Sequence, residues 1–361
     1  MACATSHHEP SVNPIVWTNT NTKNITLYSI TNKNEQAKTE GRVKRLSYEL
    51  ELRIVALVIC FIAFFYLTSL FVSGLGSLAK RFSVPESVAG ASVAAMVSSA
   101  PEMGASVFSV VEGHPDIGLG TIVGSAIFNI SLLVAFSFWV RKCVLDEKVL
   151  KRDGVFYLLV VIVTVVTIMD GVLTQWEALS WFLLYIVYFI WLFKDAIKGK
   201  FVPKEEFKYV STRKAIIYTG IGVAGIAVSA DIMVKSTVYI TDTFGLSQSL
   251  FSLIIIAIAT SVPDLFVSVD ASRKGMGSLA VSNALGSNIF DLLAGIGLPF
   301  SFVAVTHIQG NIGLSAFYLL LSVFVFLAII IFRRSLGKKE AVVLAAVYVS
   351  YLIILVLWGG M

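Results

Sequence analysis

Long apolar stretches alternate with short polar ones from about residue 50 to the end of the chain. A membrane-spanning helix needs about 20 predominantly apolar residues, and the apolar stretches have roughly this length. We therefore predict an all-α, polytopic membrane protein of ten transmembrane helices. Their expected bounds are 54–79, 86–111, 117–139, 154–171, 177–193, 215–240, 248–270, 278–300, 312–332 and 340–358.

Composition supports this class of protein. Of the 361 residues, 57% are apolar and 14% are charged, whereas soluble domains carry about 25% charged residues. Residues 1–50 differ, because they are rich in Asn, Thr and Lys and contain no apolar run. We predict a disordered polar N-terminal tail there, and not a secretory signal.

The basic residues predict an orientation, because Lys and Arg collect in cytoplasmic loops. Alternate loops contain the Lys and Arg that lie between the predicted spans, and the loops around His114, Thr174, Asp242 and His307 contain none. This alternation places both termini on the non-cytoplasmic side, although basic residues also lie just before the first span. The net charge of +5 is accounted for by these loops and does not indicate a nucleic-acid partner.

A repeat divides the chain into two halves. Shifting the sequence by 162 residues aligns SSAPE with TSVPD and GSAIFN with GSNIFD without a gap, and nine of 37 positions from Ser98 to Val134 are identical. The identities are Ser99/Ser261, Pro101/Pro263, Ser106/Ser268, Val107/Val269, Gly113/Gly275, Gly124/Gly286, Ser125/Ser287, Ile127/Ile289 and Phe128/Phe290.

Each copy of the repeat holds five predicted spans, and an odd number makes the second copy enter the membrane from the opposite side. Inverted repeats are typical of secondary transporters, whose site lies at the repeat interface near the membrane midplane. The predicted domains are a first five-helix repeat at 51–193, a short basic cytoplasmic loop at 194–214 and a second, inverted five-helix repeat at 215–361.

An acidic residue lies inside a span of each repeat. Glu102 and Asp264 occupy matching positions, where a carboxylate costs about 2.5–3.5 kcal/mol on insertion scales. Pro101 and Pro263 precede them, and each proline lacks the N–H that would bond the carbonyl four residues earlier. Irregular backbone at this depth is tolerated only where it lines a cavity or is buried in protein. The pairs indicate a bound cation, with an acid that faces a water-filled cavity as the alternative.

Further polar residues share helix faces with these acids, since residues four apart lie on one face. The resulting set of oxygen ligands suits hard cations, and fits Ca²⁺ better than Mg²⁺; Na⁺ can use the same ligands. Zinc would need His or Cys, but the four histidines lie in the tail or in short loops, and the three cysteines are scattered, which implies no disulfide framework. The pairs are Ser98 with Glu102, Thr260 with Asp264, Ser125 with Asn129, and Ser287 with Asp291.

The motifs SSAPE, GTIVGSAIFNI, IATSVPDL and GSNIFDLLAG resemble the alpha-repeat signatures of sodium/calcium exchangers in the cation/calcium exchanger superfamily. The resemblance extends from about residue 52 to the end, and SSAPE, TIVGSA and the aspartate of TSVPD are most similar to the potassium-dependent branch. It implies an antiporter that exchanges Ca²⁺ for Na⁺ by alternating access, with K⁺ co-transport as a variant. The partners would be these ions and the lipid bilayer, and neither a cofactor nor an enzymatic activity is expected.

The same resemblance implies the ion ligands. Glu102 and Asp264 would be the central Ca²⁺ carboxylates. Asn129 and Asp291 would flank them, and Asp291 is similar to the aspartate associated with K⁺ dependence. Spans 1 and 6 would slide past the central helices. The remaining ligands would be the side chains of Ser98, Ser99, Ser125, Thr260, Ser261 and Ser287 and the backbone carbonyls of Ala95 and Ala257.

Three features depart from the family pattern. Val97 and Ala259 stand where the family usually has glycine, Ala126 stands where the second repeat has Asn288, and the loop at 194–214 is too short for a calcium-sensing domain. A proton-coupled Ca²⁺/cation exchanger is the alternative function. An intramembrane hydrolase is a more distant one, because it leaves the duplication unexplained. We expect a plasma-membrane protein, with an organelle membrane as the alternative, and leave the oligomeric state open, a monomer included.

Overall fold

The computed structural model describes residues 22–81, 94–144, 150–198, 210–273, 275, 277–305, 308, 312–333 and 335–359. The chain comprises two compact units, Met1–Glu51 and Leu52–Met361. The second unit is built from helices, together with one pair of two-residue strands and one isolated bridge. Much of the predicted loop at 194–214 lies outside the described residues.

Helix α1 runs from Thr22 to Arg81 and so begins inside the segment for which composition predicts disorder. The local sequence accounts for the helix, because residues 35–51 contain many good helix formers such as Glu, Gln, Ala, Lys, Arg and Leu. Arg45 and Glu49, one helical turn apart, also form an ion pair of 3.3 Å. Residues 1–21 of the predicted tail lie outside the described residues.

The described remainder of the first half consists of shorter helices, several of which follow one another without a loop. The segments labelled η are π-helical, with one extra residue per turn. In chain order the elements are α3 (Ala94–Ser98), α4 (Ala100–Val111), α5 (Pro115–Phe128), η2 (Asn129–Leu133), α6 (Val134–Val140), β1 (Cys143–Val144), η3 (Leu150–Gly154), α8 (Val155–Ile168) and α9 (Gln175–Lys198).

The second half follows a similar plan, with a long helix first and broken helices after it. Its elements are α10 (Thr212–Phe244), α11 (Gln248–Phe251), η4 (Ser252–Ile256), α12 (Ala257–Thr260), α13 (Val262–Arg273), α14 (Gly277–Phe290), η5 (Asp291–Ile296), α15 (Gly297–Phe300), α16 (Ile312–Arg333), β2 (Ser335–Leu336) and α17 (Lys338–Gly359).

Seven of the described helical segments are long and apolar enough to cross a membrane, or eight if the bent pair Gln248–Thr260 and Val262–Arg273 is one span. The molecule is therefore a polytopic, α-helical membrane protein. Two of the ten predicted spans are not in this set. Only residues 94–111 of the second are described, and α8, in the fourth, has 14 residues. The count of ten remains a prediction.

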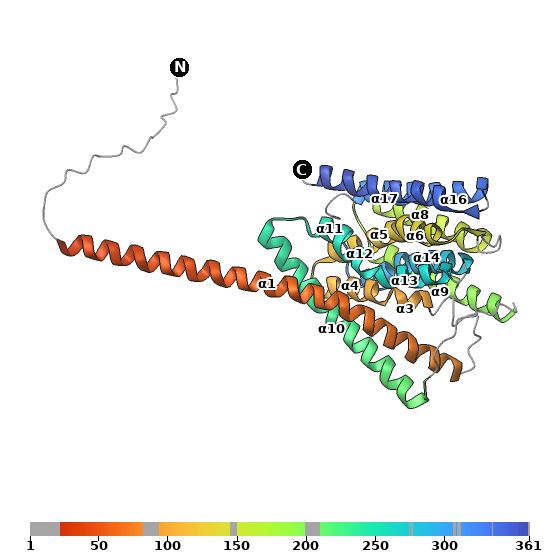
Figure 1. The fold of residues 1–361 in the computed structure, drawn as a ribbon, viewed down its shortest axis with the longest axis horizontal. Coiled ribbons are helices and arrows are strands. Elements are labelled where there is room, and N and C mark those ends of the chain that lie inside the picture. The colour runs from red at the N-terminus through yellow and green to blue at the C-terminus, as the bar shows by residue number, and fades with distance from the viewer. Residues whose placement is uncertain are drawn as a thin grey trace, which may run out of the picture. The chain divides into compact units, whose positions relative to one another are not determined.

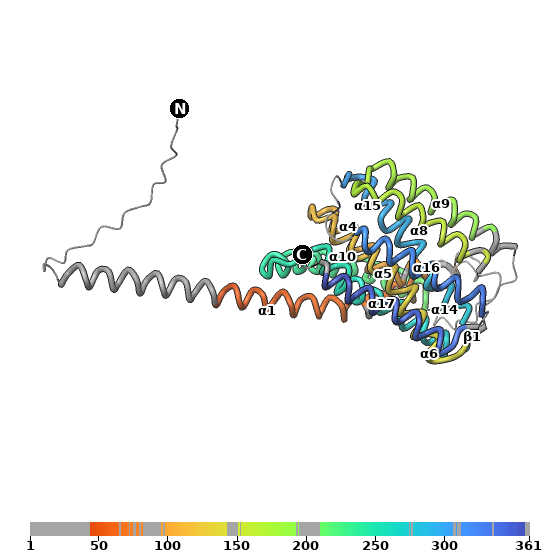
Figure 2. Tube along the Cα trace, turned by 90° about the horizontal axis from the view of Figure 1, so that it is seen from above, coloured from red at the N-terminus to blue at the C-terminus, as the bar shows by residue number. Residues whose placement is uncertain are grey.

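The most deeply buried segments are α5–α6 and α14–α15. In the most apolar 18-residue stretch, 89% of Pro115–Val140 and 83% of Gly277–Phe300 is buried, whereas the share is 28% for α10. Figure 1 shows α5, α6, α13 and α14 in the middle of the helical body, with α16 and α17 along one side, and Figure 2 shows the same body from above. Helices α16 and α17 present large exposed apolar side chains, such as Phe317 and Phe324, as lipid-facing helices do.

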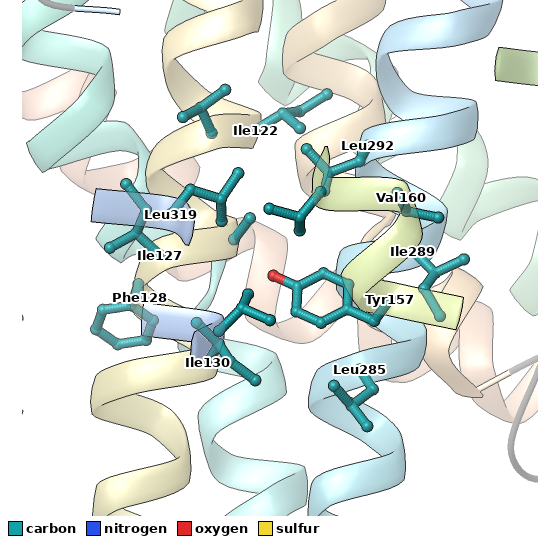
Figure 3. Close-up of a cluster of buried hydrophobic side chains, with 14 of the residues drawn as sticks. Ile122, Ile127, Phe128, Ile130, Tyr157, Val160, Leu285, Ile289, Leu292 and Leu319 are labelled. Atoms are coloured by element: carbon teal, nitrogen blue, oxygen red, sulfur yellow. The ribbon is translucent and has the colours of Figure 1, made fainter. Parts of the chain in front are cut away.

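A cluster of buried apolar side chains fills the space between the central helices and α8 and α16 (Figure 3). The cluster holds the central helices against α8 and α16, because a buried side chain touches many neighbours at close-packed density. It includes Ile122, Ile127, Phe128, Ile130, Tyr157, Val160, Leu285, Ile289, Leu292 and Leu319.

Local backbone features recur at the shift of 162 residues found in the sequence. The turns at Gly113 and Gly275 have φ values of 80° and 85°, a left-handed conformation that glycine adopts without strain. Strand β1 pairs antiparallel with β2, and Leu173 forms a bridge with Val305. The same shift carries Cys143 onto Val305 and Leu173 onto Ser335, so the two strand contacts lie at equivalent places in the two copies, within one residue.

Candidate cation site

Two helix breaks place the intramembrane acids. The chain turns at Ser99, between α3 and α4, and at Ser261, between α12 and α13, with φ and ψ of −87° and 9° at the first and −81° and −3° at the second. At the second break the helix axis bends by 43°. A proline follows each turn by two residues, where it favours the first turn of a new helix. Glu102 and Asp264 therefore lie in the first turns of α4 and α13.

A second pair of matching features carries the flanking residues. Asn129 is the first residue of the π-helical segment η2, and Asp291 is the first residue of η5. The two positions are equivalent in the repeat. π-Helical turns are rare inside α-helices and occur frequently at functional sites.

Hydrogen bonds join the two halves of the chain around the acids. Ser261 Oγ, from the second repeat, donates to Glu102 Oε1 at 3.3 Å, and Asn129 Nδ2, from the first repeat, donates to Asp264 Oδ2 at 3.3 Å. Ser287 Oγ donates to Asp264 Oδ1 at 3.1 Å. Each acid is thus held by a residue of the other repeat, and both acids are fully buried.

Most of the predicted hydroxyls meet at the same place. The hydroxyls of Ser125 and Ser261 lie 2.8 Å apart, and those of Ser98 and Ser287 lie 3.4 Å apart. The Thr260 hydroxyl donates instead to a carbonyl of its own helix, Ile256 O, at 3.0 Å.

The two predicted carbonyl ligands already accept hydrogen bonds. Ala95 O accepts from the Ser99 N–H at 3.1 Å and the Ser98 hydroxyl at 3.2 Å. Ala257 O accepts from the Ser261 N–H at 3.2 Å, and it lies 2.7 Å from the Ser261 hydroxyl, whose single proton it shares with Glu102 Oε1. Each carbonyl oxygen therefore accepts hydrogen bonds from residues of its own helix break.

Several oxygen atoms of the predicted set are buried and have no hydrogen-bond partner. They are Ser99 Oγ, Glu102 Oε2, Asn129 Oδ1 and both carboxylate oxygens of Asp291, and all four residues are fully buried. The Ser99 hydroxyl lies close to Asp291 without hydrogen-bonding geometry. A buried polar group without a partner costs about 1–3 kcal/mol, and more when it is charged. Carboxylate, amide and hydroxyl oxygens are ligands of hard cations, so these atoms fit bound cations.

The three carboxyl groups repel one another when they are ionised, because each lies within electrostatic range of the other two. Within the described part of the chain, no three His, Cys, Asp or Glu side chains form a metal-binding group by themselves. A cation here would therefore complete its coordination with hydroxyl, amide and carbonyl oxygens. That donor set suits Ca²⁺ and other hard cations and does not suit zinc.

The structure adds three residues that the sequence did not single out as ligands. Asn283 Nδ2 donates to Asp264 Oδ1 at 3.4 Å. Asn288 Oδ1 accepts from Asn129 Nδ2 at 3.1 Å, and its Nδ2 donates to Tyr157 Oη at 2.8 Å. In the sequence, Asn288 stood out only as the partner of Ala126, and Tyr157 carried no signal because it lies in an apolar segment and its own repeat counterpart is Leu319.

Val97 and Ala259, which depart from the family pattern, and the charged residues of α10 complete the surroundings of the site. The side chain of Val97 is outside the described set, and Ala259 is half-buried. Asp231 and Lys235, four residues apart in α10, form an ion pair at 2.8 Å, and Lys235 also pairs at 3.4 Å with Glu112, which directly follows the last residue of α4. These pairs tie α10 to α4 and take no part in the oxygen set around the acids.

Comparison with known proteins gives a consistent result. A family model described as sodium/calcium exchanger protein matches residues 52–194 and 214–357. The putative antiporter CaxA of Alkalimonas amylolytica is 31% identical over 241 residues, which cover 63% of this chain and 74% of that protein. The sodium/potassium/calcium exchanger 3 of Homo sapiens is 38% identical over 144 residues, which cover 38% of this chain and 22% of that protein.

A solved structure of the sodium-calcium exchanger NCX_Mj is similar in fold. The TM-score is 0.61 and the sequence identity 24%, and the match covers 84% of this chain and 98% of that chain.

Proposed function

Because the chain belongs to the sodium/calcium exchanger protein family, we propose that it is a secondary active antiporter that exchanges Ca²⁺ for Na⁺ across a membrane by alternating access. Its relatives are exchangers and antiporters, so the chain is a membrane transporter and not an enzyme. The intramembrane hydrolase that the paired acids left open is thereby excluded.

The buried oxygens without partners are the observation that carries this proposal. Ca²⁺ binds between Glu102 and Asp264, where two carboxylates and the hydroxyls around them supply hard ligands. Na⁺ binds to the hydroxyls and carbonyls next to the breaks at Ser99 and Ser261. Because the two ions use overlapping ligands, the binding of Na⁺ expels Ca²⁺, which is what exchange requires. No cofactor takes part, since the transported ions supply the only chemistry.

In the form of this proposal that includes K⁺ co-transport, K⁺ binds at Asp291. Both of its carboxylate oxygens are buried without a partner, and the sodium/potassium/calcium exchanger 3 is among the relatives. K⁺ at Asp291 would neutralise a carboxylate that repels both Glu102 and Asp264 and so stabilise the loaded site.

The architecture we propose is ten spans in two inverted five-helix repeats, with both termini on the non-cytoplasmic side of a plasma membrane. The equivalent strand contacts, turns and π-helical segments support the duplication. The acids meet where residues of the two copies bond each other, as expected for a transporter site at a repeat interface. Helices α1 and α10 then slide past this centre to open it to one side at a time.

Ca²⁺ uptake into proteoliposomes under separately applied Na⁺, K⁺ and pH gradients tests the proposal. An outward Na⁺ gradient should drive uptake at fixed pH in the wild type. Glu102→Gln and Asp264→Asn should abolish it while the folded protein remains in the membrane, because each removes a central charge. Asp242→Asn, a change in an exposed acid, serves as the control and should transport normally. Normal uptake by Glu102→Gln or Asp264→Asn would refute the assigned site.

Proton-coupled Ca²⁺/cation exchange is the second candidate. The observation in its favour is that Asp291 accepts no hydrogen bond at either oxygen, a state that a protonated carboxyl tolerates better than an ionised one. Uptake driven by a pH gradient without Na⁺ or K⁺ would establish this candidate in place of Na⁺/Ca²⁺ antiport.

A further inference from the structure

A hydrogen bond connects the helix that carries Glu102 to the helix that carries Asp291. The Ser106 hydroxyl of α4 donates to the backbone carbonyl of Gly295 in η5 at 2.6 Å. Ser106 is fully buried, so water does not compete for this bond. The two residues lie 189 positions apart in sequence, one in each repeat.

Pro299 explains why this carbonyl needs a donor from another helix. Gly295 lies near the end of η5, just before α15 begins at Gly297. In α-helical geometry its carbonyl would accept from the amide four residues later, and that residue is Pro299, which has no N–H. A buried carbonyl without a partner costs about 1–3 kcal/mol. Ser106 supplies the missing donor, and in doing so it ties α4 to η5.

The position of the bond relates it to the acids. Ser106 follows Glu102 by four residues in α4, and Gly295 follows Asp291 by four residues in η5. The bond therefore lies about one helical turn from each carboxylate. It fixes the position of α4 relative to η5 along the helix axes. Because the two carboxyl groups repel each other and Asp291 accepts no hydrogen bond, their separation depends on how the two helices are held.

The equivalent serine of the second repeat makes different contacts. Ser268 donates to Ala280 O at 3.3 Å and accepts from Asn283 Nδ2 at 3.1 Å, and both partners belong to its own repeat. Of these two identical serines, Ser106 is the one that bonds across the repeats, on the side where the flanking residue is the acidic Asp291 instead of Asn129. The bond is thus specific to the Asp291 side of the site.

We propose that Ser106 is a positioning residue whose bond to Gly295 sets the separation of Asp291 from Glu102, and with it the affinity for an alkali cation at Asp291. This inference rests on the antiport function proposed above. Loss of the bond lets η5 shift against α4 and weakens binding of the monovalent cation. The Ca²⁺ affinity stays, because Glu102 and Asp264 keep their own hydrogen bonds.

The test compares Ser106→Ala with the wild type in two assays. Titrations of Na⁺, K⁺ and Ca²⁺ against the melting temperature of the purified protein report binding, and Ca²⁺ uptake into proteoliposomes reports transport. The concentration of Na⁺ or K⁺ for half-maximal effect should rise about fivefold, as expected for one buried hydrogen bond. The Ca²⁺ concentration for half-maximal effect should change less than about twofold. Separate Na⁺ and K⁺ titrations show which ion uses Asp291.

Ser322→Ala is the matched control. Ser322 is also a fully buried serine that donates to a backbone carbonyl, but its acceptor is Tyr318 O of its own helix, at 2.7 Å. This variant should leave the half-maximal concentrations of all three ions unchanged. Equal shifts for Ca²⁺ and for the monovalent ions in Ser106→Ala would contradict a role at Asp291.

The double variant Ser106→Ala/Pro299→Ala separates positioning from stability. An alanine at 299 has an N–H that can bond the Gly295 carbonyl within its own helix, so the melting temperature without ions should return toward the wild-type value. The bond between helices is still missing, so the shift in monovalent-cation concentration should persist. If that shift also disappears, Ser106 only satisfies a carbonyl and the inference is wrong.

The outcomes distinguish this inference from the proposed function. A wild type that is stabilised by the cations but shows no Na⁺-driven Ca²⁺ uptake overturns the antiport function, while the Ser106 comparison still stands on the binding titrations. A wild type that no cation stabilises overturns both. Normal antiport with unchanged monovalent affinity in Ser106→Ala overturns the inference alone.

Discussion

Asn129 must present its carbonyl oxygen to the site. Its Nδ2 donates to Asp264 Oδ2 and Asn288 Oδ1, and a carboxylate oxygen can only accept. Asn288 is oriented in turn by its Nδ2, which donates to Ala126 O at 3.0 Å. These bonds leave Asn129 Oδ1 without a partner and available to a cation. The hydrogen-bonded amides of Asn288 and Asn129 thus orient Asn129 so that its carbonyl oxygen faces the site.

Asn288→Ala should weaken apparent Ca²⁺ affinity about tenfold, since Asn129 loses one of the groups that hold its amide. Tyr157→Phe should have a smaller effect in the same direction, because Asn288 keeps its bond to Ala126 O. Tyr351→Phe removes a buried hydroxyl bonded to Ser315 at 3.1 Å, outside the site, and should leave affinity unchanged. The measurement is Ca²⁺ dependence of uptake. A larger effect in Tyr157→Phe than in Asn288→Ala would contradict this order of contacts.

Asp291→Asn should remove any K⁺ requirement of Ca²⁺ transport, because the amide keeps the shape of the carboxyl group but loses the charge that attracts K⁺. Ca²⁺ uptake with and without K⁺ in both proteins measures the effect. The outcome that rejects the assignment is a wild type whose transport is indifferent to K⁺, or a variant that still requires it.

The sequence predicted the acids and hydroxyls of the site because a polar residue inside a span is costly and because the same residues recur after 162 positions. Asn283 and Tyr157 could not be found this way, since their repeat counterparts, Thr121 and Leu319, differ in chemistry. Ser106 was visible as a repeat identity, but its contact with Gly295 depends on the packing of helices from two repeats. Local pattern therefore predicted the candidate ligands, and only tertiary structure identified the residues that orient them.

At the scale of elements, prolines decide where the helices break. The irregular backbone that the sequence indicates next to Pro263 is observed as a 43° break at Ser261. Helix ends were harder to predict. An apolar run marks only the part of a helix that lies in the membrane, and the helix itself continues into the polar residues on either side. The segment expected at 215–240 belongs to a helix from Thr212 to Phe244, and the one expected at 154–171 holds an α-helix of only 14 residues preceded by a π-helical turn.

Pro263→Ala should raise the Ca²⁺ concentration for half-maximal transport about tenfold, which corresponds to about 1.4 kcal/mol in binding. The new N–H can bond the Ala259 carbonyl, straighten the break and move Asp264 away from Ser287. Pro115→Ala is the control, because Pro115 stands at the start of α5, where its N–H would have no helical partner. Equal affinities in the two variants would show that the break does not position the acid.

At the scale of the whole molecule, the two copies of the repeat have the same local structure but are predicted to face opposite ways. Val111 and Arg273 show this most directly. They are equivalent at the shift of 162, each is the last residue of its helix, α4 or α13, and both are exposed. The distribution of basic loops puts Val111 on the outer side and Arg273 on the cytoplasmic side.

Single cysteines at these two positions test the inversion. In a background in which Cys3, Cys60 and Cys143 are replaced by serine, Val111→Cys should react with a membrane-impermeant maleimide added outside intact cells. Arg273→Cys should react only after the membrane is permeabilised, because the odd number of spans between them reverses the direction of the chain. Retained Ca²⁺ uptake in both variants is the control for folding. Labelling of both positions from the same side would mean that the repeats are parallel and that five spans per repeat is wrong, and the proposed site between inverted halves would fall with them.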